Sequence, residues 1–99
     1  MRRAAKVDAN QRFIVEALRA VGASVELLHA VGKGCPDLLV GYGGVNYLLE
    51  VKDGSKVPSA QKLTDDQVIW HERWRGRAAV VNNVQAALQA IGALRGTIS

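Results

Sequence analysis

The segment that decides the fold runs from residue 36 to residue 52 and reads PDLLVGYGGVNYLLEVK. Its two halves are apolar runs typical of buried strands, and a proline is tolerated where the first of them starts. The pair Gly43-Gly44 separates the halves and indicates a tight two-residue turn. The segment therefore predicts an antiparallel hairpin whose arms are Pro36–Tyr42 and Val45–Lys52.

The sequence on either side of this hairpin predicts further helices and strands. Upstream, apolar residues at helical spacing predict a helix that ends near Gly22, with Asp8 or Asn10 as its cap. Downstream, Thr64-Asp65-Asp66-Gln67 forms a capping box that opens a second helix. The remaining elements are a strand over 24–29, a loop over 53–60, a strand over 77–82 and a last helix over 84–91. The order α-β-β-β-α-β-α predicts a small α/β domain around a mixed four-stranded sheet.

Size and composition limit the class of protein. The 99 residues suffice for a single domain, 1–99, in which residues 1–7 are expected to form a flexible basic N-terminus. No apolar run approaches the roughly 18 residues of a membrane span, and no apolar region follows the N-terminal arginines as a secretory signal requires. A single cysteine, Cys35, excludes an internal disulfide and, with two scattered histidines, a zinc site. These features predict a reducing, cytoplasmic location.

Net charge alone does not decide the function. The chain carries 13 Lys+Arg and 9 Asp+Glu, which leaves a formal charge of +4. This excess permits nucleic-acid binding, but it is equally common as a margin for solubility. A monomer of this size has little surface for both a core and a large substrate, so a symmetric oligomer is expected.

Three charged residues lie on the two arms of the hairpin, where charges are costly unless paired or used. Asp37 lies at the start of the first arm, and twelve residues separate it from Glu50 on the second arm. Lys52 points to the same side of the second arm as Glu50, because side chains alternate along a strand. The turn brings both carboxylates to one end of the hairpin. Together with the main-chain carbonyl of Val51 they suit Mg²⁺, which prefers oxygen ligands. The plainer interpretation is an exposed ion pair and an ordinary turn residue.

The motif Pro36-Asp37, twelve residues, then Glu50-Val51-Lys52 resembles the signature of the PD-(D/E)XK nucleases. Three further features sit in the matching order: the Gly34–Leu38 segment, the Lys62–Gln67 helix start, and the trailing strand and helix. With these features the chain resembles the VRR-NUC domain over nearly its whole length, from about residue 8 to residue 91. The similarity is greatest to the stand-alone phage and prophage versions of this domain.

This resemblance implies a restriction-endonuclease-like core and a divalent-metal-dependent DNA endonuclease that uses Mg²⁺, for which Mn²⁺ can substitute. It implies that Asp37, Glu50 and the carbonyl of Val51 bind the metal and that Lys52 is the catalytic lysine. Stand-alone members are similar to Holliday-junction resolvases, which implies a homodimer acting on branched DNA.

Two glutamines are candidates for supporting roles at this site. Many relatives carry a metal-supporting acid on the first helix, and Gln11 and Glu16 compete for that place. At about 100° per residue, Gln11 falls on the inward side with Ile14 and Leu18, whereas Glu16 points to solvent. Gln11 is therefore the candidate, through a metal-bound water. Gln67 is a second candidate catalytic residue, although its place in the capping box is the stronger explanation for it.

The candidate DNA contacts are exposed lysines and, less directly, two tryptophans. Lys56 and Lys62 flank the loop after the catalytic strand and, with Lys33, are expected to contact phosphates. Trp70 and Trp74 share one helix face, which indicates a core or dimer contact, with base stacking as the alternative.

The leading interpretation is a Mg²⁺-dependent, homodimeric endonuclease of phage or prophage type that acts on branched DNA in the cytoplasm of a bacterial host. No base-reading extension fits in the remaining residues, so binding is expected to depend on backbone charge and shape. One alternative is a non-catalytic DNA-binding or assembly module with a weakened metal site. Another is a metal-dependent hydrolase of small phosphoesters.

Overall fold

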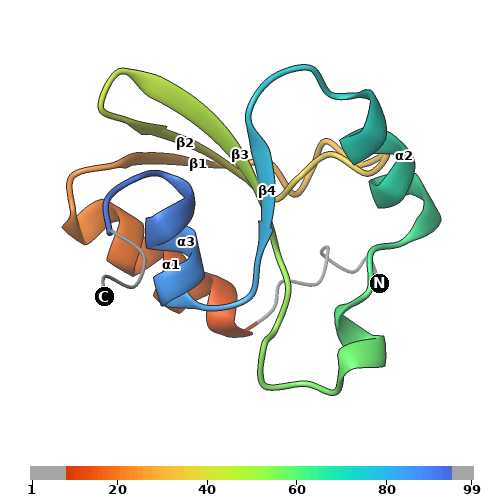
Figure 1. The fold of residues 1–99 in the computed structure, drawn as a ribbon. Helices are drawn as coiled ribbons and strands as arrows, with labels where there is room; N and C mark the ends of the chain where they lie inside the picture. Colours follow the sequence, from red (N-terminus) through yellow and green to blue (C-terminus); the bar gives the residue numbers. More distant parts are fainter. Residues whose placement is uncertain (1–8, 95–99) are drawn as a thin grey trace, which may run out of the picture.

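A computed structural model describes residues 9–94 as a small α/β domain (Figure 1). Its elements are α1 (Ala9–Ala20), β1 (Ser24–Leu27), β2 (Leu38–Tyr42), β3 (Val45–Val51), the 3₁₀ helix η1 (Pro58–Gln61), α2 (Asp65–Arg73), β4 (Ala78–Val81) and α3 (Val84–Ala90). The predicted order is confirmed, with η1 as an addition that overlaps the end of the predicted loop and extends one residue beyond it. The predicted flexible N-terminus, 1–7, and the candidate cap Asp8 lie outside the described residues. Within residues 9–94 no helix is long and apolar enough to cross a membrane.

The four strands form one mixed sheet, as predicted, in the order β1-β2-β3-β4. β1 and β3 both run antiparallel to β2, which lies between them, and β4 runs parallel to β3. Tyr42 pairs with Val45, so Gly43 and Gly44 are the whole hairpin loop. Their φ angles of +59° and +81° lie in the left-handed region, which is why this tight turn requires glycine at both positions.

The hydrophobic core lies between one face of the sheet and the pair α1 and α3 (Figure 1). Ile14 and Leu18 of α1 are fully buried there against Val40 and Leu49 of the hairpin. The periodicity of α1 explains this, because its apolar residues recur at helical spacing and form one face.

Helix α2 lies on the other side of the sheet and contributes no buried residue (Figure 1). Trp70 and Trp74 stack on each other, with ring centroids 4.7 Å apart and an interplanar angle of 16°. Neither belongs to the core cluster, so the core interpretation of these tryptophans is wrong. The dimer and base-stacking interpretations stay predictions.

Candidate active site

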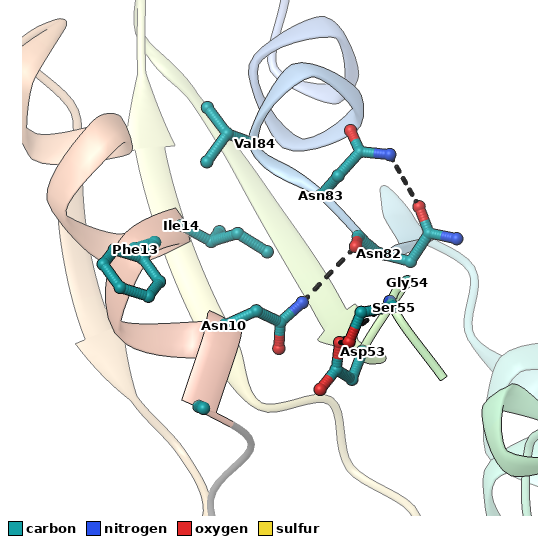
Figure 2. Close-up of a pocket in the computed structure, with 10 residues that line it drawn as sticks. Asn10, Phe13, Ile14, Asp53, Gly54, Ser55, Asn82, Asn83 and Val84 are labelled. Atoms are coloured by element: carbon teal, nitrogen blue, oxygen red, sulfur yellow. Dashed lines mark hydrogen bonds between the residues drawn. The ribbon is translucent and has the colours of Figure 1, made fainter. Parts of the chain in front are cut away.

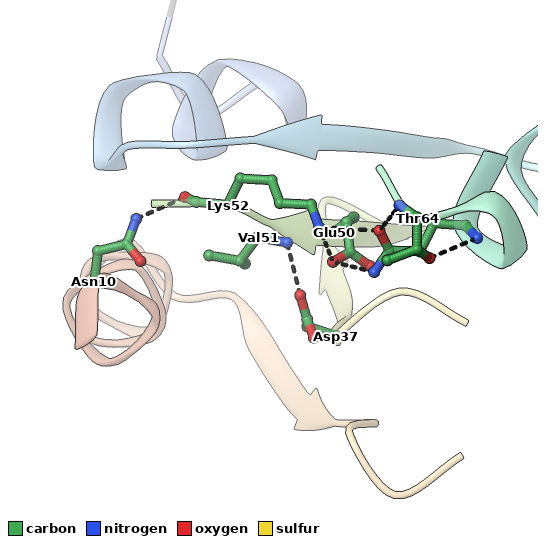
Figure 3. Close-up of polar contacts among 7 residues, drawn as sticks. Asn10, Asp37, Glu50, Val51, Lys52 and Thr64 are labelled. Atoms are coloured by element: carbon green, nitrogen blue, oxygen red, sulfur yellow. Dashed lines mark hydrogen bonds and ion pairs between the residues drawn. The ribbon is translucent and has the colours of Figure 1, made fainter. Parts of the chain in front are cut away.

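The hairpin brings its three charged residues together at its open end (Figure 3). Leu38 pairs with Leu49, and this register continued by one residue puts Asp37 across from Glu50. The main-chain N–H of Val51 donates to Oδ2 of Asp37 at 2.8 Å. The aspartate carboxylate thus accepts the hydrogen bond that a main-chain carbonyl of the neighbouring strand would otherwise accept. Asp37 is therefore held in a fixed position at the end of β2.

Glu50 and Lys52 are joined through a third side chain. Lys52 Nζ lies 3.7 Å from Glu50 Oε2. Gln67 bridges them: its Nε2 donates to Glu50 Oε2 at 3.1 Å, and its Oε1 accepts from Lys52 Nζ at 2.9 Å. The same Oε1 accepts from the main-chain N–H of Thr64 at 2.9 Å, which confirms the predicted capping box. Gln67 thus links the start of α2 to the charged cluster.

Replacing Gln67 with alanine is expected to slow cleavage of DNA about 10- to 100-fold, because Lys52 and Glu50 lose the amide that orients them. The same change removes part of the helix cap and is expected to cost about 1 kcal/mol of unfolding free energy. Thr64→Ala is the matched control, since it weakens the same cap and leaves the bridge intact. Chemical unfolding and single-turnover cleavage measure the two effects. An equal loss of activity in both variants would mean that Gln67 acts only through the cap.

Glu50 is a buried charge with an incomplete set of partners. Its residue is 3% exposed, and Oε1 has no hydrogen-bond partner among the described residues. Burial, helped by the neighbouring Asp37 carboxylate, raises the pKa of Glu50 to about 8, although Lys52 opposes the shift. A buried carboxyl group with an unpartnered oxygen beside a second carboxylate is unfavourable in isolation, and a bound cation removes the cost.

The residues present fit a divalent cation with oxygen ligands. Within residues 9–94 no group of three or more His, Cys, Asp and Glu side chains is arranged to hold a metal. The candidate ligands are instead the carboxylates of Asp37 and Glu50 and the main-chain carbonyl of Val51. The N–H of Val51 points toward Asp37, and in a strand the carbonyl of the same residue points to the same side. Two carboxylates, one carbonyl and several waters match the preference of Mg²⁺.

Gly34 allows α2 to approach this cluster closely. Its φ is +82°, and a Cβ added there would overlap the carbonyl group of Asp66 in the first turn of α2. This contact sets the position of Gln67, the next residue, relative to Glu50. A glycine is therefore needed at this place both for its backbone conformation and for the lack of a side chain.

Gly34→Ala is expected to destabilise the fold by about 2–4 kcal/mol, and to lower activity by displacing Gln67. Gly32→Ala is the matched control, because Gly32 has a φ of +76° but nothing within 4 Å of an added Cβ. The control is expected to cost about 1 kcal/mol for strain alone. Urea unfolding of both variants measures the difference. Equal losses of stability would show that the approach of α2 is not tight in solution.

The structure places the two competing residues of α1 as predicted, but a third residue reaches the hairpin. Gln11 is 5% exposed and Glu16 is exposed. Gln11 borders a hollow near Leu27 and makes no hydrogen bond with the charged cluster, so its metal-supporting role stays a prediction. Asn10, predicted as a possible cap, instead lies within α1, and its Nδ2 donates to the main-chain oxygen of Lys52 at 2.8 Å. In the sequence, the only indication that Asn10 reaches the hairpin is its place next to Gln11 on the first helix.

The predicted DNA contacts lie on exposed loops beside the cluster. Lys56 and Lys62 flank η1, and Lys33 precedes Gly34 in the turn that contacts α2. All three are exposed, as phosphate contacts require, and their role stays a prediction. Cys35 lies nearby, and burial raises the pKa of its thiol, with further upward shifts from Glu50 and Asp37. The thiol is therefore neutral near pH 7 and unsuited to nucleophilic attack.

A hairpin of two central strands that carries two carboxylates and a lysine at its open end is the arrangement expected of a nuclease-type domain. A comparison with solved structures supports this class: the chain is similar to a "VRR_NUC domain" structure, with a TM-score of 0.61 and 31% sequence identity over 82% of this chain and 88% of that chain. The chain belongs to the VRR-NUC domain family. No family model and no curated protein matches the sequence. The match makes this a nuclease-type, DNA-processing domain of the kind that uses divalent metals.

Proposed function

We propose that this domain is a Mg²⁺-dependent DNA endonuclease, with Mn²⁺ as a substitute, that acts as a homodimer on branched DNA. The observation that carries the proposal is the unpartnered, buried Oε1 of Glu50 beside Asp37, with Lys52 on its other oxygen. A purely structural ion pair would not need the second carboxylate. A phage or prophage source and a cytoplasmic location are further parts of the proposal and rest on the sequence alone.

The chemistry follows from the positions of these groups. A divalent cation supplies positive charge to the phosphodiester and lowers the pKa of water. Asp37, Glu50 and the carbonyl of Val51 would hold it. Lys52 stabilises the negative charge that develops on the phosphate oxygens in the transition state, and Gln67 fixes the direction of its ammonium group. Water gives up a proton and forms a new bond to phosphorus, while one phosphorus–oxygen bond of the backbone breaks and the departing oxygen takes up a proton.

Cleavage of defined DNA substrates tests this function. Purified protein is incubated with four-way junction, nicked and linear duplex DNA, in Mg²⁺, in Mn²⁺ and in EDTA. Branched DNA is expected to be cut in either metal and not in EDTA, and Asp37→Ala is expected to be inactive. Glu16→Ala, which removes an exposed carboxylate of α1 outside the cluster, is the control and is expected to keep full activity. Cleavage that survives Asp37→Ala would contradict the assignment.

A second candidate function is a non-catalytic DNA-binding module with a weakened metal site. The upward pKa shift of Glu50 to about 8 favours it, because a protonated carboxyl group binds cations poorly at neutral pH. Salt-sensitive DNA binding without cleavage at pH 9, where Glu50 is ionised, would support the module. Hydrolysis of a small phosphodiester with no effect on any DNA would support the remaining alternative, a small-phosphoester hydrolase.

The homodimer is supported by apolar side chains that one protomer leaves exposed on and beside α2. Ile69 is 50% exposed, Trp74 46% and Val80 of β4 44%. Such residues are common in interfaces between subunits, where a second copy removes them from water. Because α2 also carries Gln67, a dimer through this helix would join the two catalytic clusters rigidly.

Ile69→Lys is therefore expected to convert a dimer to a monomer without unfolding it, because the side chain is exposed in the single protomer. Sedimentation equilibrium at several concentrations measures the change. Val21→Lys is the control, since Val21 is 39% exposed and directly follows the last residue of α1. A monomeric wild-type protein at high concentration would rule out the homodimer.

A further inference from the structure

A cavity of about 490 Å³ lies beside the candidate active site, at the ends of the parallel strands β3 and β4 (Figure 2). Its walls come from the first turns of α1, from the loop 53–55 and from the β4–α3 junction. Asn10 joins it to the catalytic strand, because its Nδ2 contacts the main-chain oxygens of Lys52 at 2.8 Å and of Asn82 at 3.3 Å. A ligand in this cavity would therefore lie next to the residue that follows Lys52.

One wall of the cavity is apolar. It includes Phe13, Ile14 and Val84, and their side chains are drawn around the opening in Figure 2. Phe13 is 54% exposed, although phenylalanine is among the residue types most often buried. The guanidinium carbon of Arg12 lies 5.5 Å from the centroid of its ring. A flat ring at the rim of a cavity offers a surface on which a second flat ring can stack.

The other wall carries neutral amide groups with unused hydrogen-bonding capacity. Asn10 Oδ1 is buried and has no partner in the part of the chain that the structure describes. Asn83 Nδ2 donates to Asn82 Oδ1 at 2.9 Å, and Asn82 Nδ2 donates to Gln61 Oε1 at 3.0 Å. Each Nδ2 carries two protons, and the second proton of each has no acceptor among the described residues. The wall thus presents an acceptor and donors together.

The charge of the cavity does not favour a phosphate group. Among the residues that the structure describes, neither lysine nor arginine lines it. In the same part of the chain its one ionisable lining residue is Asp53, whose Oδ1 accepts hydrogen bonds from the Ser55 hydroxyl at 2.7 Å and the Ser55 N–H at 3.0 Å. An anion would be repelled by this carboxylate, whereas a neutral ring with its own N–H groups would not.

We propose that this cavity binds an unpaired nucleobase of the DNA substrate, beside the phosphate that is cut. Asparagine amides match the donor and acceptor groups on base edges, and a base stacks on an aromatic ring whatever its sequence. A base inside a duplex cannot enter, since its edge is paired and its faces are stacked. The cavity therefore admits nucleotides at branches, flaps and loops, and excludes intact duplex. This inference rests on the proposed action on DNA, and it gives a physical reason why the protein would act on branched DNA in preference to intact duplex.

Two substitutions test the cavity without touching the charged cluster. Phe13→Ala removes the exposed ring, and Ala9→Leu adds atoms at the exposed first position of α1, where the cavity opens. Ala20→Leu, at the exposed last residue of the same helix, and Val21→Ala, at the exposed residue that follows it, are the matched controls. The probe is DNA with 2-aminopurine at an unpaired position next to a branch, and the fully paired duplex serves as reference. EDTA is present throughout, so that no cut occurs.

The wild-type protein and both controls are expected to bind the unpaired-base DNA more tightly than duplex and to change the 2-aminopurine fluorescence. Phe13→Ala and Ala9→Leu are expected to lose about tenfold in this affinity, and to keep the affinity for duplex. Unchanged affinity in both variants, or an equal loss for duplex, overturns the proposal. The readout is binding, so it is separate from the cleavage test. If both variants bind the unpaired-base DNA like wild type and cut DNA normally with metal present, the nuclease function stands and the base-binding cavity is rejected. If the wild-type protein binds the unpaired-base DNA preferentially but cuts no DNA, the cavity stands and the nuclease function is rejected.

Discussion

Replacing Glu50 with glutamine is expected to abolish DNA cleavage and, in the metal-free protein, to stabilise the fold at pH 8. Glutamine keeps the shape of the side chain and its hydrogen bond from Gln67, but it removes one of two charges available to a cation. A loss of at least about a thousandfold in rate is expected, which corresponds to about 4 kcal/mol of activation free energy. Single-turnover cleavage of branched DNA in saturating Mg²⁺ measures it.

The stability effect of the same change follows from the raised pKa of Glu50. Below pH 4.5 the carboxyl group is protonated in both the folded and the unfolded chain, and it has no influence. As the pH rises toward about 8, the unfolded chain releases this proton and the folded chain keeps it, so the free energy of unfolding falls. The glutamine of Glu50→Gln does not ionise, so its free energy of unfolding does not fall in this way. The variant is expected to be about 2 kcal/mol more stable than wild type at pH 8 in EDTA.

Urea unfolding at pH 4.5 and pH 8 checks this prediction, with Glu16→Gln as the control for loss of an exposed carboxylate. Mg²⁺ is expected to raise the stability of the wild-type protein at pH 8 and to leave Glu50→Gln unchanged. If Glu50→Gln is instead less stable than wild type at pH 8, Glu50 contributes to folding as an ion-pair partner of Lys52, and the cation site loses its main support.

Replacing Lys52 with alanine is expected to separate catalysis from metal binding. The ammonium group lies 3.7 Å from Glu50 Oε2, so its removal leaves the two carboxylates more attractive to a cation. Metal affinity is expected to be unchanged or higher. The cleavage rate is expected to fall about 100- to 1,000-fold, because the transition state loses a positive group. A Mg²⁺ titration of the single-turnover rate gives both quantities from one experiment.

Lys56→Ala is the matched control for this change. Lys56 is exposed four residues further along the chain and is predicted to contact phosphate. Its loss is expected to weaken binding of every DNA to a similar extent and to reduce the salt dependence, with an unchanged rate at saturation. If Lys52→Ala behaves like Lys56→Ala, then Lys52 binds DNA and does not stabilise the transition state.

Much of this fold is predictable because its decisive signals are local. Gly43-Gly44 determines a two-residue hairpin through backbone conformation alone, and the capping box at Thr64 determines where α2 begins. The apolar stripe of α1 also predicts the burial of Gln11 and the exposure of Glu16. By contrast η1 was missed, because its four residues lie in a segment with no apolar periodicity.

The members of the candidate site are predictable, but their connections are not. Asp37, Glu50 and Lys52 follow from strand alternation and the turn between them. The bridge from Gln67 to both Glu50 and Lys52, and the contact from Asn10 to Lys52, join positions 15 to 42 residues apart. Such contacts depend on how α1 and α2 pack on the sheet. The raised pKa of Glu50 has the same origin, because it reflects burial in the folded chain.

The position of a bound cation tests the central claim most directly. Anomalous scattering from Mn²⁺-soaked crystals locates the ion without reference to activity. The account predicts a Mn²⁺ ion at the open end of the hairpin, within about 2.5 Å of a carboxylate oxygen of Asp37 and of Glu50 and of the main-chain oxygen of Val51. An ion bound elsewhere, or an empty hairpin end at pH 9 where Glu50 is ionised, would contradict it.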